Sequence, residues 1–421
     1  IPSLAHQYFK KEECYKDVYE IGGIPQQFIQ ETTVGGRCMT CENQRISCEK
    51  ILNDFDAVSL YPSAMKRMGF LKGKPKVIKE ENLNYNYLKK QDGYFVEIHI
   101  LKVNNHLKFP LLSSIDDNGV RNWTNDMVGN TIKVCRFALE DLIEFQGVEF
   151  EVLKGYYYDE GRNYKIKEVI DYIFQERLKW KDAENPLEQI YKLIMNSAYG
   201  KTIMKPIEND AVFFNSKKSF QAYLSKNYNY ISEYIEYSPE KYKCFIIRPF
   251  IQHFNLAHIG SEILAMSKRI MNEVMVLAEQ NHLTMTYTDT DSIHILDNEV
   301  EILAEKFEEK YKRKLIGKEM GQFHTDFELR VRVDKGNDID GEKCKNIVSI
   351  KSIFLGKKSY IDVLRGYDPV LVDDEGNPIV IYGLHIRMKG INLGCIQYYG
   401  WENGKEIIEI YQDLLTNEEG I

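Results

Sequence analysis

The sequence lacks any apolar run long enough to cross a membrane. A membrane-spanning helix needs about 20 consecutive, mostly apolar residues, and no such run occurs in the 421 residues. The opening segment IPSLAHQYFK has neither the basic start nor the apolar stretch of a secretory signal, and it has no initiator methionine. We therefore expect a fragment or a processed chain, with no membrane contact and a cytoplasmic location.

Cysteine and tryptophan are scarce, and positive charge is in deficit. Eight cysteines are too few for a disulfide scaffold in a chain of this length and favour a reducing compartment. With 55 Lys and Arg against 63 Asp and Glu, the formal net charge is −8. This balance argues against indiscriminate nucleic-acid binding but leaves room for a local basic channel. In contrast, 43% of the residues are hydrophobic, which excludes a mainly disordered chain.

Helical and strand patterns are mixed along the chain without a repeating βαβ order, which predicts an α+β fold. Strands are expected at 51–56, 94–101, 283–288, 292–296 and within 347–363. Helices are expected from Pro62 to Gly69, at 165–183, at 186–199 with Gly200 as the end, at 254–281 and at about 400–415. The stretch 201–250 is expected to be irregular, and the stretch before the last helix to be rich in turns.

The first acidic motif is DAVSLYPS at 56–63. Asp56 ends an expected strand, and a tight turn then leads into a helix that contains Pro62 in its first turn. A carboxylate beside the free N–H groups of a helix start suits a divalent cation that holds a phosphate chain. The alternative is an ordinary strand-end Asp followed by a helix that begins with Pro.

The second acidic motif is YTDTDS at 287–292. Asp289 and Asp291 are two positions apart, so they face the same side of an extended chain. Apolar segments flank them, and carboxylates so close together repel each other unless a cation joins them. A turn that is merely rich in Asp is the alternative. Together with Asp56 they would form a two-metal site for phosphoryl transfer, provided that the fold joins the two motifs.

A third motif, KLIMNSAYG at 192–200, places three different side chains on one helical face. Lys192, Asn196 and Tyr199 are spaced by four and then three residues. A cation, an amide and an aromatic ring on one face fit a nucleotide, although a solvated Lys beside a core Tyr is the alternative. Arg177, Lys179 and Lys181, on the preceding helix, would add charge for phosphate or would belong to a solvated helix face.

These motifs resemble a known family. DAVSLYPS, KLIMNSAYG, YTDTDS and KKSY (357–360) follow the order and character of motifs A, B, C and KxY of family B DNA polymerases, and the sequence is most similar to the protein-primed (φ29-like) branch. TVGGR at 33–37 resembles the YxGG motif of that branch, with Thr33 at the Tyr position. The resemblance runs from about residue 3 to about residue 392.

The resemblance implies a right-hand fold of palm, fingers and thumb, with an antiparallel palm sheet. The expected domains are 1–111 (N-terminal segment and first part of the palm), 112–165 (an insert like terminal-protein region 1), 166–200 (fingers), 201–250 (an insert like terminal-protein region 2), 251–361 (palm with motif C and KxY) and 362–421 (thumb). In that branch the inserts contact the priming protein and help strand displacement.

The resemblance also implies roles for individual residues. Asp56 and Asp291 resemble the metal-bridging carboxylates, with Asp289 in support and Ala57 as a further metal contact. Tyr61 resembles the steric gate against a ribose 2′-hydroxyl, and Lys192 the lysine on the incoming triphosphate. The other expected dNTP-binding residues are Ser59, Leu60, Lys179, Lys181, Asn196 and Tyr199. The expected DNA-binding residues are Gly35, Gly36, Arg37, Ser197, Gly200, Lys358, Tyr360 and Lys389.

The implied activity is template-directed DNA synthesis with two Mg²⁺ ions, for which Mn²⁺ would substitute. The implied partners are primer-template DNA, dNTPs, a terminal priming protein and a separate exonuclease chain. Two other classes stay open: a catalytically idle, polymerase-like DNA-binding subunit and a two-metal nuclease. A nuclease would need the carboxylates but neither the Tyr61 gate nor the helical face of motif B.

Two departures from the family matter. Only 55 residues precede Asp56, too few for the proofreading exonuclease domain that usually comes before motif A. The Asp-x-Glu sequence at Asp326-Phe-Glu328 follows motif C, and we expect it to be structural. We therefore expect no exonuclease activity in this chain. Separately, Cys38, Cys41 and Cys48 form a zinc site or, more simply, serve as small apolar residues, because a single CxxC lacks the second pair of a strong zinc motif.

Overall fold

The computed structural model describes residues 2–204, 209–247, 255–331 and 341–416. Its central element is a nine-stranded sheet in which all pairings are antiparallel. Seven strands follow the order β1 (Cys38–Thr40), β15 (Met285–Asp289), β16 (Ser292–Leu296), β3 (Leu52–Ala57), β18 (Lys345–Gly356), β19 (Ser359–Val372) and β20 (Pro378–Met388). Two short strands complete it: β17 (Phe323–Thr325) pairs with β3, and β2 (Ile46–Cys48) with β18.

A long central helix, α9 (Ala257–Gln280), packs against this sheet. Ile263, Ile270 and Val274 of α9 belong to the same hydrophobic core as Phe55 of β3 and Ile293 of β16. Full burial of each such side chain stabilises the fold by about 1.5–3 kcal/mol. The helices that contact α9 are α2 (Gly23–Gln30), α3 (Leu60–Met68), α5 (Arg136–Gln146), α7 (Leu187–Thr202) and α10 (Val300–Tyr311).

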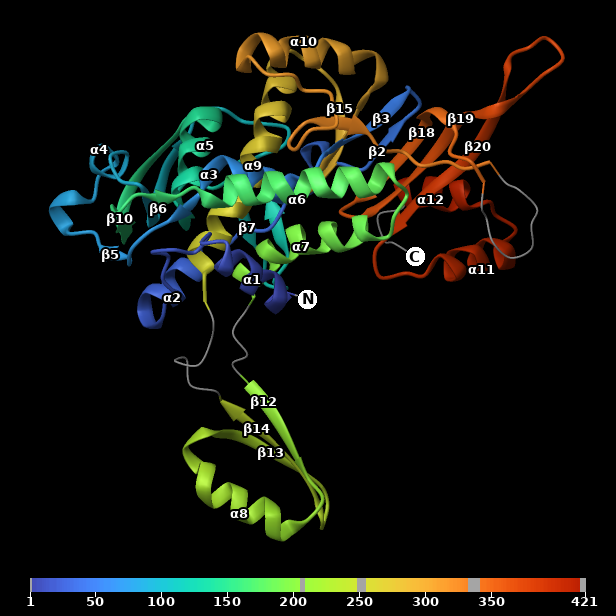
Figure 1. Cartoon of the computed structure of the whole chain (residues 1–421). Coiled ribbons are helices and arrows are strands. Elements are labelled where there is room, and N and C mark those ends of the chain that lie inside the picture. Colours follow the sequence, from blue (N-terminus) through green and yellow to red (C-terminus); the bar gives the residue numbers. More distant parts are fainter. Residues whose placement is uncertain (1, 205–208, 248–254, 332–340, 417–421) are drawn as a thin grey trace.

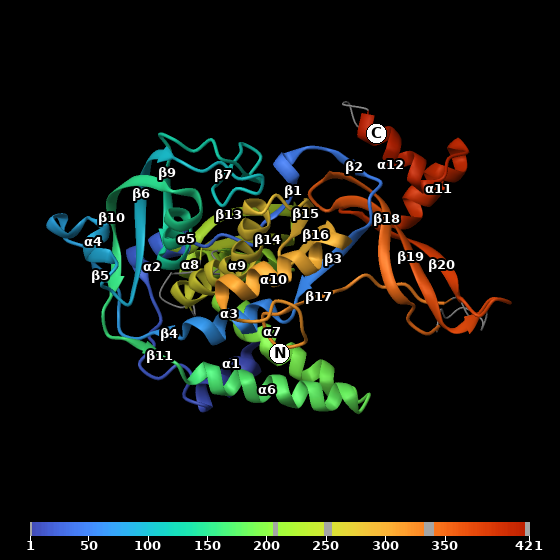
Figure 2. The ribbon, with the colours of Figure 1, turned by 90° about the horizontal axis from the view of Figure 1, so that it is seen from above.

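A second sheet lies at the end of the molecule opposite to β18–β20 (Figures 1 and 2). Its strands are β5 (Lys76–Val77), β10 (Val148–Tyr158), β6 (Gly93–Val103) and β9 (Thr131–Cys135), and it has a hydrophobic core of its own. The neighbouring short elements are β4 (Phe70–Leu71), α4 (Tyr85–Leu88), the hairpin β7 (Ser113–Ile115) and β8 (Arg121–Trp123), and β11 (Arg162–Asn163).

Helices α6 (Lys165–Asp182) and α7 run side by side, and α1 (Pro2–Lys11) contacts α7 (Figure 1). Asn185 accepts a hydrogen bond from the Leu187 N–H at 3.0 Å, so its side chain caps the start of α7. At the C-terminal end, α12 (Ile407–Thr416) packs on β18 and β19, and α11 (Leu393–Asn403) contacts α12. None of the helices in the described ranges combines the length and the apolarity that a membrane span requires.

A small unit occupies residues 209–247. It consists of β12 (Asn209–Phe214), α8 (Lys217–Asn227), β13 (Ile231–Ser238) and β14 (Lys241–Ile247), with β14 as the middle strand. Phe220 of α8 packs on Tyr242 and Cys244 of the sheet, which gives the unit its own hydrophobic core. The expectation of an irregular 201–250 segment is therefore wrong for this part, whereas 205–208 and 248–250 lie outside the described residues.

The predicted α+β class is confirmed, and so are most of the predicted elements, with three further differences. The stretch 378–388, which was expected to be rich in turns, forms the strand β20 after a tight turn at Asp373–Asn377. Gly200 lies inside α7 rather than at its end, and the final helical region is split into α11 and α12. The sequence-based domain boundaries stay predictions, and the one between 361 and 362 falls within β19.

Candidate active site

Pairing of β3 with β16 brings the two acidic motifs together. Asp56 lies opposite Ser292 in the register, and the Ala57 N–H donates to the Asp291 carbonyl at 2.8 Å. The β15–β16 hairpin turns at Thr290, whose φ of 62° is rare outside glycine and stores strain at this tip. Asp56, Asp289 and Asp291 consequently line one cleft of about 850 Å³.

The electrostatics of this cleft suit a cation. Burial, and then the charge of Asp291, raise the pKa of the Asp56 carboxyl to about 8. Burial, and then Asp289 and Asp54, raise the pKa of Asp291 to about 6. Partly buried carboxylates whose pKa values are raised by burial and by neighbouring carboxylates form a favourable site for a divalent ion, which offsets both costs.

No group of three or more His, Cys, Asp or Glu side chains within the described ranges is arranged to hold a metal ion by itself. That finding is compatible with Mg²⁺, which is commonly bound by one or two carboxylates together with substrate phosphates. It also applies to Cys38, Cys41 and Cys48, which are free cysteines. The Cys38 thiol lies 3.3 Å from the Tyr287 hydroxyl, which ties β1 to β15.

We expect Mg²⁺ to stabilise the chain more at pH 8.5 than at pH 6. Because the pKa of each carboxyl is raised in the folded state, the metal-free chain loses stability as pH rises from about 4 towards about 8. A bound cation offsets this loss. Melting temperatures in EDTA and in Mg²⁺ at both pH values measure this stabilisation. Asp56→Asn is the control, because removing the carboxyl should flatten the pH dependence. A melting temperature that does not respond to pH in EDTA would contradict this electrostatic account.

Asp289 differs from the other two carboxylates because the ammonium group of Lys358 already pairs with it. The Lys358 ammonium lies 2.7 Å and 2.5 Å from its two oxygens, and the Lys358 N–H donates to the Tyr287 hydroxyl at 3.0 Å. Tyr360 is buried against Tyr287 and His385, while Lys389 is exposed and its N–H donates to the Lys358 carbonyl. The KxY motif thus borders the acidic cleft, and its role at the primer end stays a prediction.

The start of α3 lies at the edge of this site. Ser59 precedes the helix with a left-handed φ of 51°, and no side chain caps the helix there. The first N–H groups of a helix have no intrahelical partner, so the backbone at Leu60 and Tyr61 is suited to an anion. Arg177 of α6 donates to the Ser59 hydroxyl at 3.3 Å and pairs with Glu188 of α7 at 2.8 Å, which joins three helices at this point.

Motif B meets motif A through two aromatic rings. Tyr61 of α3 and Tyr199 of α7 are stacked with ring centroids 4.0 Å apart and an interplanar angle of 10°. Lys192 and Asn196 are exposed, whereas Met195 and Ala198 of α7 are buried, as the predicted single polar face requires. The hydrogen bond with His324 lowers the pKa of Asp326 in the acidic cleft, and the charge of Lys192 adds a smaller contribution. The polar face of motif B therefore lies within electrostatic reach of the carboxylates.

The other predicted residues of α6 and α7 are less well placed. Lys179 is exposed, lies 3.8 Å from Glu176 and sits over the Trp180 ring. Lys181 is exposed near the end of α6, which is typical of a solvated helix face. Ser197 is half-buried, and a side chain at Gly200 would meet open space. Nothing in these contacts singles them out for nucleotide or DNA binding.

The glycine pair of TVGGR packs directly on the acidic turn. A Cβ at Gly36 would lie 2.6 Å from the Thr290 Cγ2 atom, whereas a Cβ at Gly35 would meet nothing within 4 Å. The Thr290 N–H donates to the Arg37 carbonyl at 2.8 Å. The Arg37 side chain is buried and donates to the Phe109 and Pro110 carbonyls, so its role in this arrangement is structural and does not fit the predicted DNA contact.

Gly36→Ala is therefore expected to displace the acidic turn and to lower activity by about 10-fold or more, since overpacking costs about 1–3 kcal/mol. Gly35→Ala is the matched control and should change activity little. Thr290→Gly, at a position with φ of 62°, should rescue Gly36→Ala because it removes the clashing atoms. Primer-extension rates of the parent chain, the two alanine variants and the Gly36→Ala/Thr290→Gly double variant measure these effects. Equal losses for both alanine variants would rule out the packing explanation.

Several residues of this region were missed from the sequence. Asp54 precedes Asp56 by two positions and faces the same cleft, as strand alternation could have indicated. Asp326 and Glu328, which were expected to be structural, also line it. Behind the cleft, Asp362 is fully buried and lies 3.4 Å from His294 and 3.2 Å from His385. These contacts join strands that are distant in the sequence, so no local signal could have revealed them.

The sequence of this chain is similar to those of known DNA polymerases. The family model for DNA polymerase type B, organellar and viral, matches residues 1–276. The chain is 26% identical over 310 residues to a probable DNA polymerase of Neurospora intermedia and 25% identical over 318 residues to the DNA polymerase of Streptococcus phage Cp-1. Each match covers 70% of this chain but 30% and 48% of the relatives, so the chain spans less than half the length of these two curated relatives.

Solved structures agree on the fold. The structure of phi29 DNA polymerase with primer-template DNA matches 96% of this chain and 61% of its own, with a TM-score of 0.62 and 15% identity. Its ternary complex with incoming nucleotides matches with the same TM-score and 16% identity. The predicted right-hand polymerase fold is therefore confirmed. Since the family model covers well over half of its residues, the chain belongs to the type B DNA polymerases of the organellar and viral group.

Proposed function

We propose that the chain is the polymerase part of a template-directed DNA polymerase. A primer 3′-hydroxyl would attack the α-phosphate of a dNTP, form the new phosphodiester bond and release pyrophosphate. The observation that carries this proposal is the β3–β16 pairing, which unites Asp56 and Asp291 in one cleft. The family membership supports it.

The residues around the cleft fit these tasks. Asp56 and Asp291, with the backbone at Ala57, would hold divalent cations, because burial and then neighbouring carboxylates raise their pKa values and a cation offsets both costs. Bound Mg²⁺, or Mn²⁺ in its place, would neutralise charge on the attacking and leaving oxygens. Lys192 would bind the triphosphate beside the start of α3, and Tyr61, held by its stack on Tyr199, would face the sugar.

Lys358 has a second task in this proposal. Its ammonium neutralises Asp289, which lowers the negative charge at the edge of the cleft where a primer phosphate would approach. Tyr360, buried beside it, would fix the position of the KxY strand. Gly36 would keep the acidic turn in place for the template strand, since its missing side chain gives Thr290 room.

We infer that the partners are primer-template DNA and dNTPs, the molecules bound in the phi29 structures. A terminal priming protein, a separate exonuclease chain and a cytoplasmic place of action are further parts of the proposal. The unit at 209–247, within the proposed second insert, and the region 112–165 would contact the priming protein and help to displace the non-template strand.

A primer-extension assay with the purified chain tests the function. A 5′-labelled primer on a longer template should lengthen with Mg²⁺ and dNTPs and stay unchanged in EDTA. Shortening of the primer would indicate a two-metal nuclease instead, and binding of DNA without any change in length would indicate an idle subunit. Failure to lengthen the primer under all metal conditions, in a chain that is folded and binds DNA, would overturn the proposal.

A further inference from the structure

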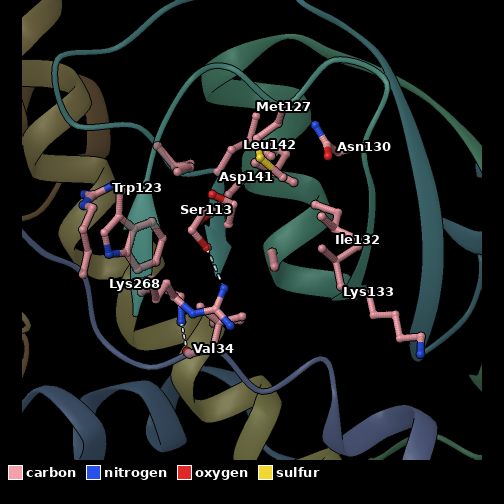
Figure 3. Close-up of a pocket in the computed structure, with 18 of the residues that line it drawn as sticks. Val34, Ser113, Trp123, Met127, Asn130, Ile132, Lys133, Asp141, Leu142 and Lys268 are labelled. Carbon is pink, nitrogen blue, oxygen red and sulfur yellow. Dashed lines mark hydrogen bonds between the residues drawn. The ribbon is translucent and has the colours of Figure 1, made fainter. Parts of the chain in front are cut away.

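A second cavity lies between helices α5 and α9 and the β7–β8 hairpin (Figure 3). Its volume is about 350 Å³, at the lower end of the range of about 300–1,000 Å³ for pockets that hold small organic ligands. It shares no lining residue with the acidic cleft. Much of its wall is apolar, and its largest ring is the indole of Trp123, which lies on the side opposite to Ile132 in Figure 3.

Four cationic side chains line this cavity. Lys133 pairs with the carboxylates of Glu31 and Glu97, whereas the hydrogen-bond acceptors of the other three are uncharged. The Lys268 ammonium donates to the Val34 carbonyl, drawn as a dashed line in Figure 3, and to the Gly35 carbonyl at 3.3 Å. Arg121 donates through Nη1 to the Ser113 hydroxyl at 2.8 Å. Arg37 donates through Nη1 to two backbone carbonyls, each at 3.2 Å.

The two acidic residues that line this cavity are already engaged, Glu31 by Lys133. Asp141 accepts from Arg269 at 2.6 Å and from Asn272 at 2.9 Å. Burial, and then the charges of Arg121 and Arg37, lower the pKa of Lys268 to about 7. Moreover, the buried Arg37 Nε–H donor has no hydrogen-bond partner among the described residues. Cations crowded into a buried site and an unpaired buried donor are costly, and a bound anion relieves both.

We propose that this cavity binds a nucleotide, with its phosphate held by Lys268 and Arg121 and its base against Trp123. Lysine and arginine are the usual donors to phosphate, and an indole provides a stacking surface for any base. The nucleotide would be free in solution or the end of a nucleic-acid strand. The site is independent of the proposed polymerase activity, although the Arg37 carbonyl links it to the Thr290 turn.

Fluorescence of Trp123 provides a site-specific test. The sequence has three tryptophans, so Trp180→Phe and Trp401→Phe in the full chain leave Trp123 as the single indole. Titration is carried out with dAMP, in EDTA, because without cations the carboxylates of the acidic cleft repel phosphate. We expect saturable quenching of Trp123, since the base would stack on its ring. A titration with inorganic phosphate should not quench but should compete with dAMP.

The charge requirement is tested in the same background. Arg121→Gln should weaken dAMP binding about 10-fold or more, because it removes charged hydrogen bonds, and Arg121→Lys should restore part of it. Arg45→Gln, an exposed arginine outside the cavity, is the matched control and should have no effect. Melting temperatures verify that each variant is folded, and Lys268→Met provides a second variant if Arg121→Gln is not.

A 5′-phosphorylated single-stranded oligonucleotide distinguishes the two sources of the nucleotide. Quenching by dAMP indicates a free nucleotide, and quenching by the oligonucleotide alone indicates a strand end; both support the site. The proposal is overturned if neither probe quenches Trp123, or if quenching is the same in the folded Arg121→Gln or Lys268→Met variant as in the parent chain.

Discussion

Asp291→Asn is expected to lower the rate of primer extension about 1,000-fold or more while DNA binding stays nearly unchanged. The substitution keeps the shape of the side chain but removes the charge that, with Asp56, would hold the cations. Preorganised charge at a reacting centre is worth about 100- to 1,000-fold for a single neutral donor, and a bridging carboxylate contributes to the site of both ions. Single-turnover extension and fluorescence anisotropy with labelled primer-template measure the two quantities.

Asp326→Asn is the matched control for this prediction. Asp326 lines the same cleft, but it follows β17 and lies outside the β3–β16 pair that carries the proposed ligands. We expect a loss of less than about 10-fold. Similar losses for both variants would mean that total negative charge, rather than the placement of Asp291, determines activity. Full activity of Asp291→Asn would remove the basis of the proposed function.

Tyr61→Ala is expected to reduce discrimination against ribonucleotides by about 10- to 100-fold. The Tyr61 ring is held against Tyr199 at a centroid distance of 4.0 Å, so it cannot easily move away from an added 2′-hydroxyl. Forcing an extra atom into a packed site costs about 1–3 kcal/mol, and each 1.36 kcal/mol is a factor of ten in rate. The ratio of kcat/KM for a dNTP to that for the matching rNTP measures the effect.

Tyr61→Phe separates the ring from its hydroxyl. If the ring itself excludes the ribose, Phe should retain most of the discrimination, because the aromatic stack on Tyr199 is preserved. Loss of discrimination in Tyr61→Phe would instead indicate that the phenol hydroxyl selects the sugar. Unchanged discrimination in Tyr61→Ala would refute the assignment of Tyr61 as the gate and would leave the stack with a purely structural role.

Most of the secondary-structure elements that carry the candidate site could be predicted from local sequence signals. Asp56 at the end of β3, the helix that contains Pro62, and the hairpin around Asp289 and Asp291 were all predicted, because alternation and turn residues act within a few positions. The shared polar face of Lys192, Asn196 and Tyr199 was predicted from helical spacing. The strand β20 and the small unit at 209–247 were not, since their turn-rich or Tyr-rich sequences gave no clear period.

Contacts between residues distant in the sequence determine the environment of several site residues. Nothing around Arg37 in the sequence indicates that its side chain is buried among backbone carbonyls, or that Lys358 neutralises Asp289. Likewise, the requirement for glycine at position 36 but not at 35 arises from the approach of Thr290, more than 250 positions away along the chain. These are packing effects between distant segments, which a local pattern does not encode.

The sequence by itself determined the chemical groups of this protein and the elements that carry them, because backbone preference and side-chain period are local properties. Only the tertiary structure decided which groups meet. Antiparallel pairing of β3 with β16 set Asp56 beside Asp291, and packing of α3 on α7 set Tyr61 on Tyr199. Such juxtapositions depend on burying a common core around α9, and that core exists only once the whole chain has folded.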